Sequence, residues 1–111
     1  MAAMKRGEVW WVNFDSSLGG EVQKQRPAVI VSNDAANKHL NRLQVVPLTT
    51  QVDRIYPSEA PLVLRGKPHK AMADRLTTVS KTRLSEQLGR VSPKDLQAIE
   101  QAIRVQLGLL P

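Results

Sequence analysis

An acidic and a basic side chain that could act together on a phosphate lie five residues apart in the sequence. Glu21 follows the loop Gly19–Gly20, and Arg26 precedes Pro27. The Arg26 guanidinium is planar and permanently charged, which suits a phosphate, and Pro27 restricts the backbone beside it. The Glu21 carboxylate is a candidate general base if burial raises its pKa toward neutrality. From these residues alone, a solvent loop in which Arg26 pairs with Glu21 is the simpler interpretation.

Other common kinds of active site have little support in the sequence. There is no Cys, which removes cysteine nucleophiles, disulfides and thiolate zinc sites. The two His, His39 and His69, have no evident Ser or acidic partner, so we expect both on the surface. Glycine-rich phosphate loops and the GxSxG motif of serine hydrolases are absent. We therefore expect no metal site and no cofactor.

The charge balance favours an anionic partner. Lys and Arg number 16 against 10 Asp and Glu, which gives a net charge of +6 and an isoelectric point near 10.2. Residues 65–83 hold six basic side chains and one acidic one. Such a patch favours a nucleic acid, through counterion release, or an acidic protein segment. A solvated face that only aids solubility has the same composition.

The length of 111 residues suits one domain, 1–111, that builds a core without disulfides. There is no apolar run of the roughly 20 residues that a membrane span needs, and Met1–Arg6 lacks the apolar part of a secretory signal. We therefore expect a cytoplasmic protein with no membrane partner.

Short strands separated by turn residues predict an antiparallel barrel or sandwich. Apolar, β-branched and aromatic residues favour strands at 8–14, 26–32, 43–49 and 75–79, with weaker candidates at 61–64, 70–73 and 87–91. The second of these is largely apolar, so we expect it to be buried on both faces. Pro47 predicts that its strand lies at a sheet edge or contains a bulge there. Residues 33–41 predict a short helix with Asn33 or Asp34 as its N-cap.

The C-terminal segment predicts an amphipathic helix. Ser92 is a typical N-cap, Pro93 suits the first helical position, and Gly108 is a plausible end. An apolar stripe follows the helical period and must be buried against the sheet or another subunit; it consists of Leu96, Ile99, Ile103 and Leu107.

Five segments, taken in order, carry a family resemblance that spans nearly the whole chain. They are Arg6–Trp11, the Gly19–Glu21 loop leading into Arg26–Ser32, Val46–Thr50, Asp74–Leu84, and Gly89–Val91 with the helix after it. Together they resemble the MazF/PemK (Kid-like) family of toxin endoribonucleases. This resemblance implies a mainly β fold with a C-terminal helix (α+β), built as a small SH3-like antiparallel β-barrel of the MazF/PemK/CcdB type.

The resemblance also implies an activity and partners. Members are toxins of type II toxin–antitoxin systems that cleave single-stranded RNA at short sequences without a metal. The ribose 2′-hydroxyl attacks the phosphate, which leaves 2′,3′-cyclic phosphate and 5′-hydroxyl ends. The expected partners are single-stranded RNA, a second copy of the chain in a homodimer, and a cognate antitoxin with an acidic C-terminal tail.

The resemblance assigns catalytic roles to Arg26, Thr49 and Glu21, and a possible one to Asp74 as a base. One branch of the family uses this Asp together with an Arg two residues before it. This chain has Met72 at that earlier position, so we favour Arg26 and Thr49. Strand alternation predicts that only one of Thr49 and its neighbour faces the site. The residues expected to bind RNA are Gly20, Lys24, Thr50, Arg75, Lys81 and Arg83.

A non-catalytic interaction protein is the alternative. One form is a toxin of the same barrel fold that binds DNA gyrase, and another is a basic SH3-like RNA-binding module. The gyrase form has weak support, because the chain ends in Gly108–Leu109–Leu110–Pro111 and lacks the aromatic end of such inhibitors.

Overall fold

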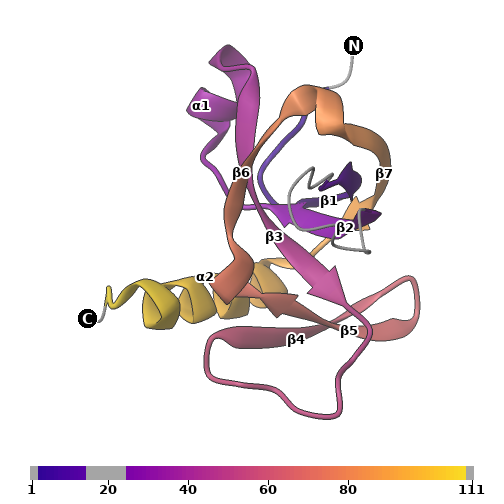
Figure 1. The fold of residues 1–111 in the computed structure, drawn as a ribbon, viewed down its shortest axis with the longest axis vertical. Helices are drawn as coiled ribbons and strands as arrows, with labels where there is room; N and C mark the ends of the chain where they lie inside the picture. The colour runs from indigo at the N-terminus through magenta and orange to yellow at the C-terminus, as the bar shows by residue number, and fades with distance from the viewer. Residues whose placement is uncertain (1–2, 15–24, 110–111) are drawn as a thin grey trace.

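A computed structural model of the chain describes residues 3–14 and 25–109. Within these ranges it has seven strands, two α-helices and two 3₁₀ helices (Figure 1). The strands are β1 (Glu8–Asn13), β2 (Gln25–Ile30), β3 (Arg42–Thr49), β4 (Glu59–Leu64), β5 (Lys67–Met72), β6 (Thr77–Ser80) and β7 (Leu84–Arg90). The α-helices are α1 (Asp34–His39) and α2 (Pro93–Leu107), and the 3₁₀ helices are η1 (Ala73–Arg75) and η2 (Lys81–Arg83).

The strands form one antiparallel sheet in the order β4-β5-β3-β2-β1-β7, and β6 also pairs with β3. β1, β2, β3, β6 and β7 curl around one another as an open barrel, while the β4–β5 hairpin extends from the end of β3 (Figure 1). The expected mainly β barrel with a C-terminal helix is therefore confirmed.

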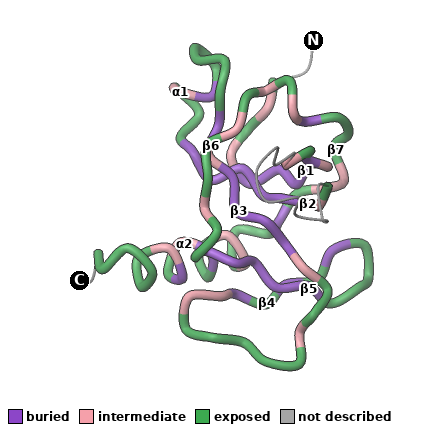
Figure 2. Tube along the Cα trace, viewed as in Figure 1, coloured by how far each residue is buried: buried purple, intermediate pink, exposed green. Residues whose placement is uncertain are grey.

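The strand predicted to be buried on both faces contributes to two apolar cores. Figure 2 shows buried residues along both β2 and β3. Ala28 and Ile30 of β2 face the barrel interior, and Val29 faces the layer under α2. Because strand side chains alternate, β2 and β3 each contribute to both cores. The barrel core contains Trp10, Val12, Ala28, Ile30, Leu43, Val45 and Leu84. The core between the sheet and α2 includes Val9, Val29, Val46, Leu48, Leu62 and Ala71 with Ile99 and Ala102 of the helix.

Pro47 does not lie at an edge or a bulge as predicted, because β3 has neighbours on both sides. β2 pairs with β3 at Val45–Pro47, while on the other side β6 pairs with Arg42–Val45 and β5 pairs with Leu48–Thr49. Pro47 falls between the β6 and β5 ladders, where its missing N–H removes no ladder hydrogen bond. The chain thus keeps a proline in a central strand.

Two other local predictions were wrong. Arg75 was expected to open a strand, but it ends η1, and β6 begins only at Thr77. His39 is exposed as expected, whereas His69 is buried in β5 with its Nδ1 2.8 Å from the Lys67 carbonyl oxygen. Neither the turn at η1 nor the burial of β5 is visible in the local sequence, since both result from how β5 packs against β3 and β4.

The C-terminal helix has the predicted ends. Ser92 caps the N-terminus, Pro93 occupies the first turn, and Gly108 ends the helix with a left-handed φ of 71°. Ile99 is buried, but Leu107 is 54% exposed, so the predicted stripe is not covered by this chain at its last position. Neither α-helix within the described residues is long and apolar enough to cross a membrane.

Removing the N-cap hydroxyl of α2 is expected to destabilise the fold moderately. The Ser92 Oγ accepts a hydrogen bond from the Asp95 N–H at 3.0 Å, and losing such a cap costs about 1 kcal/mol. Ser92→Ala should therefore lower Tm by about 5 °C in a domain of this size. Thermal unfolding followed by circular dichroism tests this, with Ser58→Ala as the control, since the Ser58 hydroxyl makes no hydrogen bond within the described residues. Equal Tm values for the two variants would contradict the capping role.

Candidate active site

Sheet register brings the two favoured catalytic residues to one row of the sheet. Ala28 of β2 pairs with Pro47 of β3, and continuing this register by two residues places Arg26 opposite Thr49. Thr49 in turn pairs with Lys70 of β5. Side chains directly opposite each other across antiparallel strands have Cβ atoms about 5 Å apart. Arg26, Thr49 and Lys70 therefore project side by side from three neighbouring strands.

These side chains line a polar pocket of about 430 Å³. The pocket gathers five of the predicted site residues, from β2, the end of β3 and η1. They are Arg26, Thr49, Thr50, Asp74 and Arg75. It also contains four residues that the sequence analysis did not assign, namely Gln51, Glu59, Lys70 and Met72. Asp74 and Arg75 reach the pocket because η1 turns the chain directly after β5.

The electrostatics of Arg26 favour an anion beside it. The pKa of Arg26 is lowered from its ordinary value, first because partial burial desolvates the guanidinium and second because the positive charge of Arg75 lies nearby. Both effects make the charged guanidinium less favourable in the free protein. A bound phosphate would relieve both, because it supplies hydrogen-bond acceptors and opposite charge.

Both threonines line the pocket, which corrects the prediction from strand alternation. β3 ends at Thr49, so the alternation rule no longer applies to Thr50. The Thr49 Oγ1 accepts a hydrogen bond from the Gln51 N–H at 3.2 Å. This contact holds the hydroxyl oxygen and leaves its hydrogen available to a ligand. Thr49 is half-buried and Thr50 is exposed, so Thr49 is the better fixed donor.

An ion pair that the sequence analysis missed lies within the pocket. The Lys70 Nζ lies 2.9 Å from the Glu59 Oε1, and the two side chains are only 10% and 9% exposed. Burial alone would raise the pKa of Glu59, but hydrogen bonds from the Tyr56 N–H and Lys70, with the charges of Lys70 and Arg75, lower it overall. Glu59 is therefore ionised at neutral pH. In the sequence, this ion pair is indicated only by the spacing of the two charges, which become diagonal neighbours once β4 and β5 form a hairpin.

The remaining predicted residues are not brought into this pocket by the described structure. Gly20, Glu21 and Lys24 lie outside the described residues, so their roles stay predictions. Lys81 and Arg83 lie in η2, which follows the pairing of Ser80 with Arg42 at the opposite end of β3 from Thr49. Seven residue steps of strand separate the two ends by about 24 Å. Lys81 and Arg83 could therefore contact only an RNA segment remote from Arg26.

The sequence also matches a known family over residues 5–107, described as the PemK-like, MazF-like toxin of type II toxin–antitoxin systems. The chain belongs to this family. Among relatives of the MazF type, it is 36% identical over 115 residues to the endoribonuclease MazF9 of Mycobacterium tuberculosis, covering 96% of this chain and 98% of that protein. It is 34% identical over 103 residues to the endoribonuclease toxin MazF of Escherichia coli, covering 92% of each.

Solved MazF-type structures have the same fold. MazF of Deinococcus radiodurans superposes with a TM-score of 0.83 at 26% identity, over 97% of this chain and 99% of that one. A mycobacterial endoribonuclease, solved in complex with its cognate antitoxin, superposes with a TM-score of 0.79 at 30% identity, over 96% and 97%. The barrel and the terminal helix are thus the common MazF-type framework.

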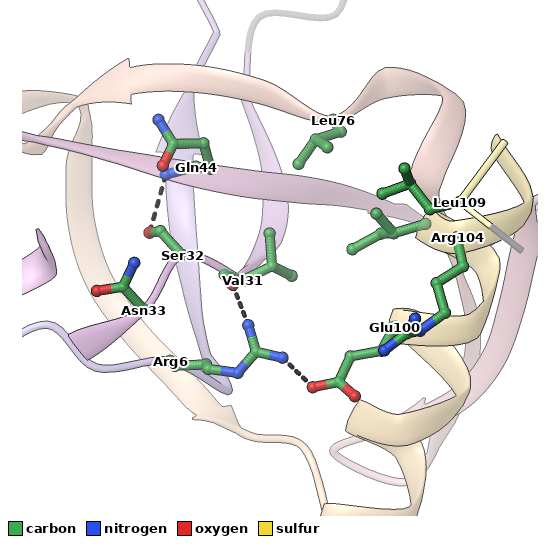
Figure 3. A pocket seen from close by; sticks show the side chains of 10 residues that line it. Arg6, Val31, Ser32, Asn33, Gln44, Leu76, Glu100, Arg104 and Leu109 are labelled. Carbon is green, nitrogen blue, oxygen red and sulfur yellow. Dashed lines mark hydrogen bonds and ion pairs between the residues drawn. The ribbon is translucent and has the colours of Figure 1, made fainter. Parts of the chain in front are cut away.

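A second pocket of about 560 Å³ lies on this MazF-type fold between α2 and the β2–β3 side of the sheet. Figure 3 shows that Arg6 reaches across it, donating hydrogen bonds to the Val31 carbonyl oxygen and to Glu100 of α2. Both contacts tie the helix to the sheet. The Arg6 guanidinium is therefore already engaged within the chain, and the polar pocket around Arg26 fits phosphate chemistry better.

Proposed function

We propose that this MazF-type endoribonuclease toxin cleaves single-stranded RNA at short sequences by attack of the ribose 2′-hydroxyl, without a metal ion. The observation that carries the proposal is the placement of Arg26 and Thr49 in one pocket, from adjacent strands. RNA supplies its own nucleophile, so the protein has to align it, stabilise charge on the phosphoryl group and move two protons.

Arg26 and Thr49 have complementary tasks in this reaction. The 2′-oxygen forms a bond to phosphorus while the bond from phosphorus to the 5′-oxygen breaks, which leaves a 2′,3′-cyclic phosphate and a 5′-hydroxyl. Negative charge builds on the nonbridging oxygens as this happens. The Arg26 fork can donate to two of these oxygens, and the Thr49 hydroxyl can donate one hydrogen bond to the same group.

The proton steps need a base for the 2′-hydroxyl and a proton for the departing 5′-oxygen. We propose Glu21 as the base, and its position outside the described residues leaves this as a prediction from sequence. Asp74 is the second candidate, since it lines the same pocket. Met72 lines that pocket too, at the position where the branch that uses the Asp has an Arg. Glu21→Gln should therefore change the pH–rate profile more than Asp74→Asn.

The ends of the products test the proposed reaction directly. Purified protein is incubated with defined single-stranded RNA in EDTA, and the fragment ends are identified. We expect fragments with 2′,3′-cyclic phosphate and 5′-hydroxyl ends at a short recurring sequence. Cleavage that stops in EDTA, or fragments with 5′-phosphate ends, would contradict the reaction. RNA binding without any cleavage would favour the interaction module over the nuclease.

Replacing the Thr49 hydroxyl is expected to slow cleavage while leaving the fold intact. Thr49→Val keeps the side-chain shape but removes a hydrogen bond to a charged group, which is worth about 2 kcal/mol, or about 30-fold in kcat. Single-turnover rates measure the loss, and Thr78→Val on β6, outside the pocket, should cleave like the wild type. A greater loss in Thr50→Val than in Thr49→Val would instead make Thr50 the donor.

We also propose a cognate antitoxin and a homodimer for this chain. The net charge of +6 and the cluster of Arg26, Lys70 and Arg75 favour an acidic antitoxin tail over the same pocket that takes RNA. The exposed Leu107 and Leu109 near the end of α2 are apolar surface that a second copy could cover. Leu110 continues this apolar end in the sequence and lies outside the described residues.

A further inference from the structure

Lys70 is held by three groups from two different segments. Its ammonium donates to the Arg54 carbonyl oxygen at 2.7 Å, pairs with Glu59 at 2.9 Å, and lies 5.6 Å from the centre of the Tyr56 ring. Glu59 in turn accepts the Tyr56 N–H at 2.9 Å. The ion pair therefore connects β5 and β4 with the segment that follows Thr49. The long lysine side chain is fixed in direction rather than free in solvent.

The buried pair is not explained by stability. Removing two charges from water costs several kcal/mol per ion, and apolar residues of similar volume often serve equally well. β4 and β5 already bury apolar side chains such as Leu62 and Ala71. The pair lies instead among the groups that line the polar pocket, beside Thr49 in the sheet register. Its position indicates a role in the pocket.

The ammonium has one hydrogen left for a ligand. A protonated lysine carries three N–H donors, and the contacts to Arg54 and Glu59 use two. Basic side chains outnumber acidic ones in the pocket lining. The basic ones are Arg26, Lys70 and Arg75, and the acidic ones are Glu59 and Asp74. Because Arg26 and Lys70 line the same pocket, a phosphate bound there could accept the third N–H.

We propose that Lys70 is a further substrate-contacting residue that donates a hydrogen bond to an RNA phosphate oxygen, and that Glu59 is the residue that positions it. The inference rests on the proposed nuclease function and adds a second cation to Arg26 at the phosphate. Glu59 directs the ammonium without touching RNA. The arrangement spans the β4–β5 hairpin, so this hairpin forms part of the RNA site.

Two readouts test the proposal. Cleavage is measured as kcat/KM, and binding is measured at several salt concentrations with an RNA whose ribose at the cleavage site is 2′-O-methylated. Lys70→Met should lower kcat/KM by about 30-fold, as expected for one hydrogen bond to a charged group. It should also reduce the slope of log K against log salt by about 0.7, because one phosphate contact to single-stranded RNA is lost. Lys67→Met is the matched control, since it removes the same charge from an exposed position of β5 outside the pocket.

Variants of Glu59 separate contact from positioning. Glu59→Gln keeps the ammonium, so its salt slope should equal that of the wild type while kcat/KM falls by about 3-fold. The double variant Lys70→Met/Glu59→Gln should cleave like Lys70→Met alone, because Glu59 acts through Lys70. The double variant also removes both charges of the buried pair, so it keeps the test valid if Lys70→Met alone fails to fold.

Several results would overturn the role of Lys70. One is a kcat/KM equal to that of the wild type in Lys70→Met or in the double variant. Another is a lower kcat/KM with an unchanged salt slope of RNA binding, which indicates a structural role only. An equal loss in Lys67→Met would show a general charge effect. Because the wild type is assayed beside the variants, failure of the nuclease proposal appears separately, as absence of cleavage by the wild type itself.

Discussion

Arg26→Gln is expected to lower kcat/KM for RNA cleavage by about 10³-fold, since removing a donor that stabilises developing charge costs this much in other enzymes. Arg26→Lys should lose about 10²-fold, because it keeps the charge but not the planar fork that binds two oxygens. Partial burial and the charge of Arg75 give the physical reason: both lower the pKa of Arg26 in the free protein, and phosphate charge offsets both. Initial rates on one defined RNA measure both losses.

Arg42→Gln is the matched control for Arg26. Arg42 is an exposed arginine at the opposite end of β3 from Thr49, so the variant changes net charge equally. It should cleave within about 2-fold of the wild type, as surface substitutions do. Thermal unfolding of all three variants checks that the fold is retained. Full activity in Arg26→Gln would remove the guanidinium from the reaction, and wild-type activity in Arg26→Lys would show that charge alone suffices.

A 2′-deoxyribose on the 5′ side of the cleaved bond is expected to stop cleavage altogether, a loss of more than about 10⁴-fold. The substitution removes only the nucleophile, so binding to the pocket should change little. Cleavage and competition are therefore measured with the same oligonucleotide, once the cut site is mapped. The modified RNA should inhibit cleavage of the unmodified RNA at a concentration near the KM of the unmodified RNA.

The control oligonucleotide carries the deoxyribose one nucleotide farther along, on the 3′ side of the bond. It should be cleaved within about 5-fold of the unmodified RNA, because a 2′-hydroxyl there contributes at most a hydrogen bond. Cleavage of the first oligonucleotide at any comparable rate would mean that water or a protein group attacks the phosphate. That result would contradict the cyclic phosphate product as well.

The sheet register is where tertiary structure added most to the site. Lys70 and Glu59 each look like an ordinary surface charge in sequence, since nothing local indicates burial. They become a buried pair only because β5 pairs with β3 and β4, which places Lys70 beside Thr49. His69 is buried for the same reason. Such long-range pairings have no signature in a single segment of sequence.

Local chemistry determined the elements themselves. The Ser92 cap and Pro93, the apolar period and the terminal Gly108 predicted α2 nearly residue by residue, because helix ends depend on side chains close in sequence. The apolar strand after Arg26 was correctly predicted to be buried on both faces. The resemblance to a toxin family was likewise carried by sequence, and it named Arg26 and Thr49.

What the sequence determined was therefore the set of elements, the positive charge and the two residues favoured for catalysis. The tertiary structure decided which side chains meet. It brought Asp74 and Arg75 to the pocket through the turn at η1, and it separated Lys81 and Arg83 from the pocket by the length of β3. The physical reason is that a residue's type is local, whereas its neighbours depend on strand pairing between segments far apart in the chain.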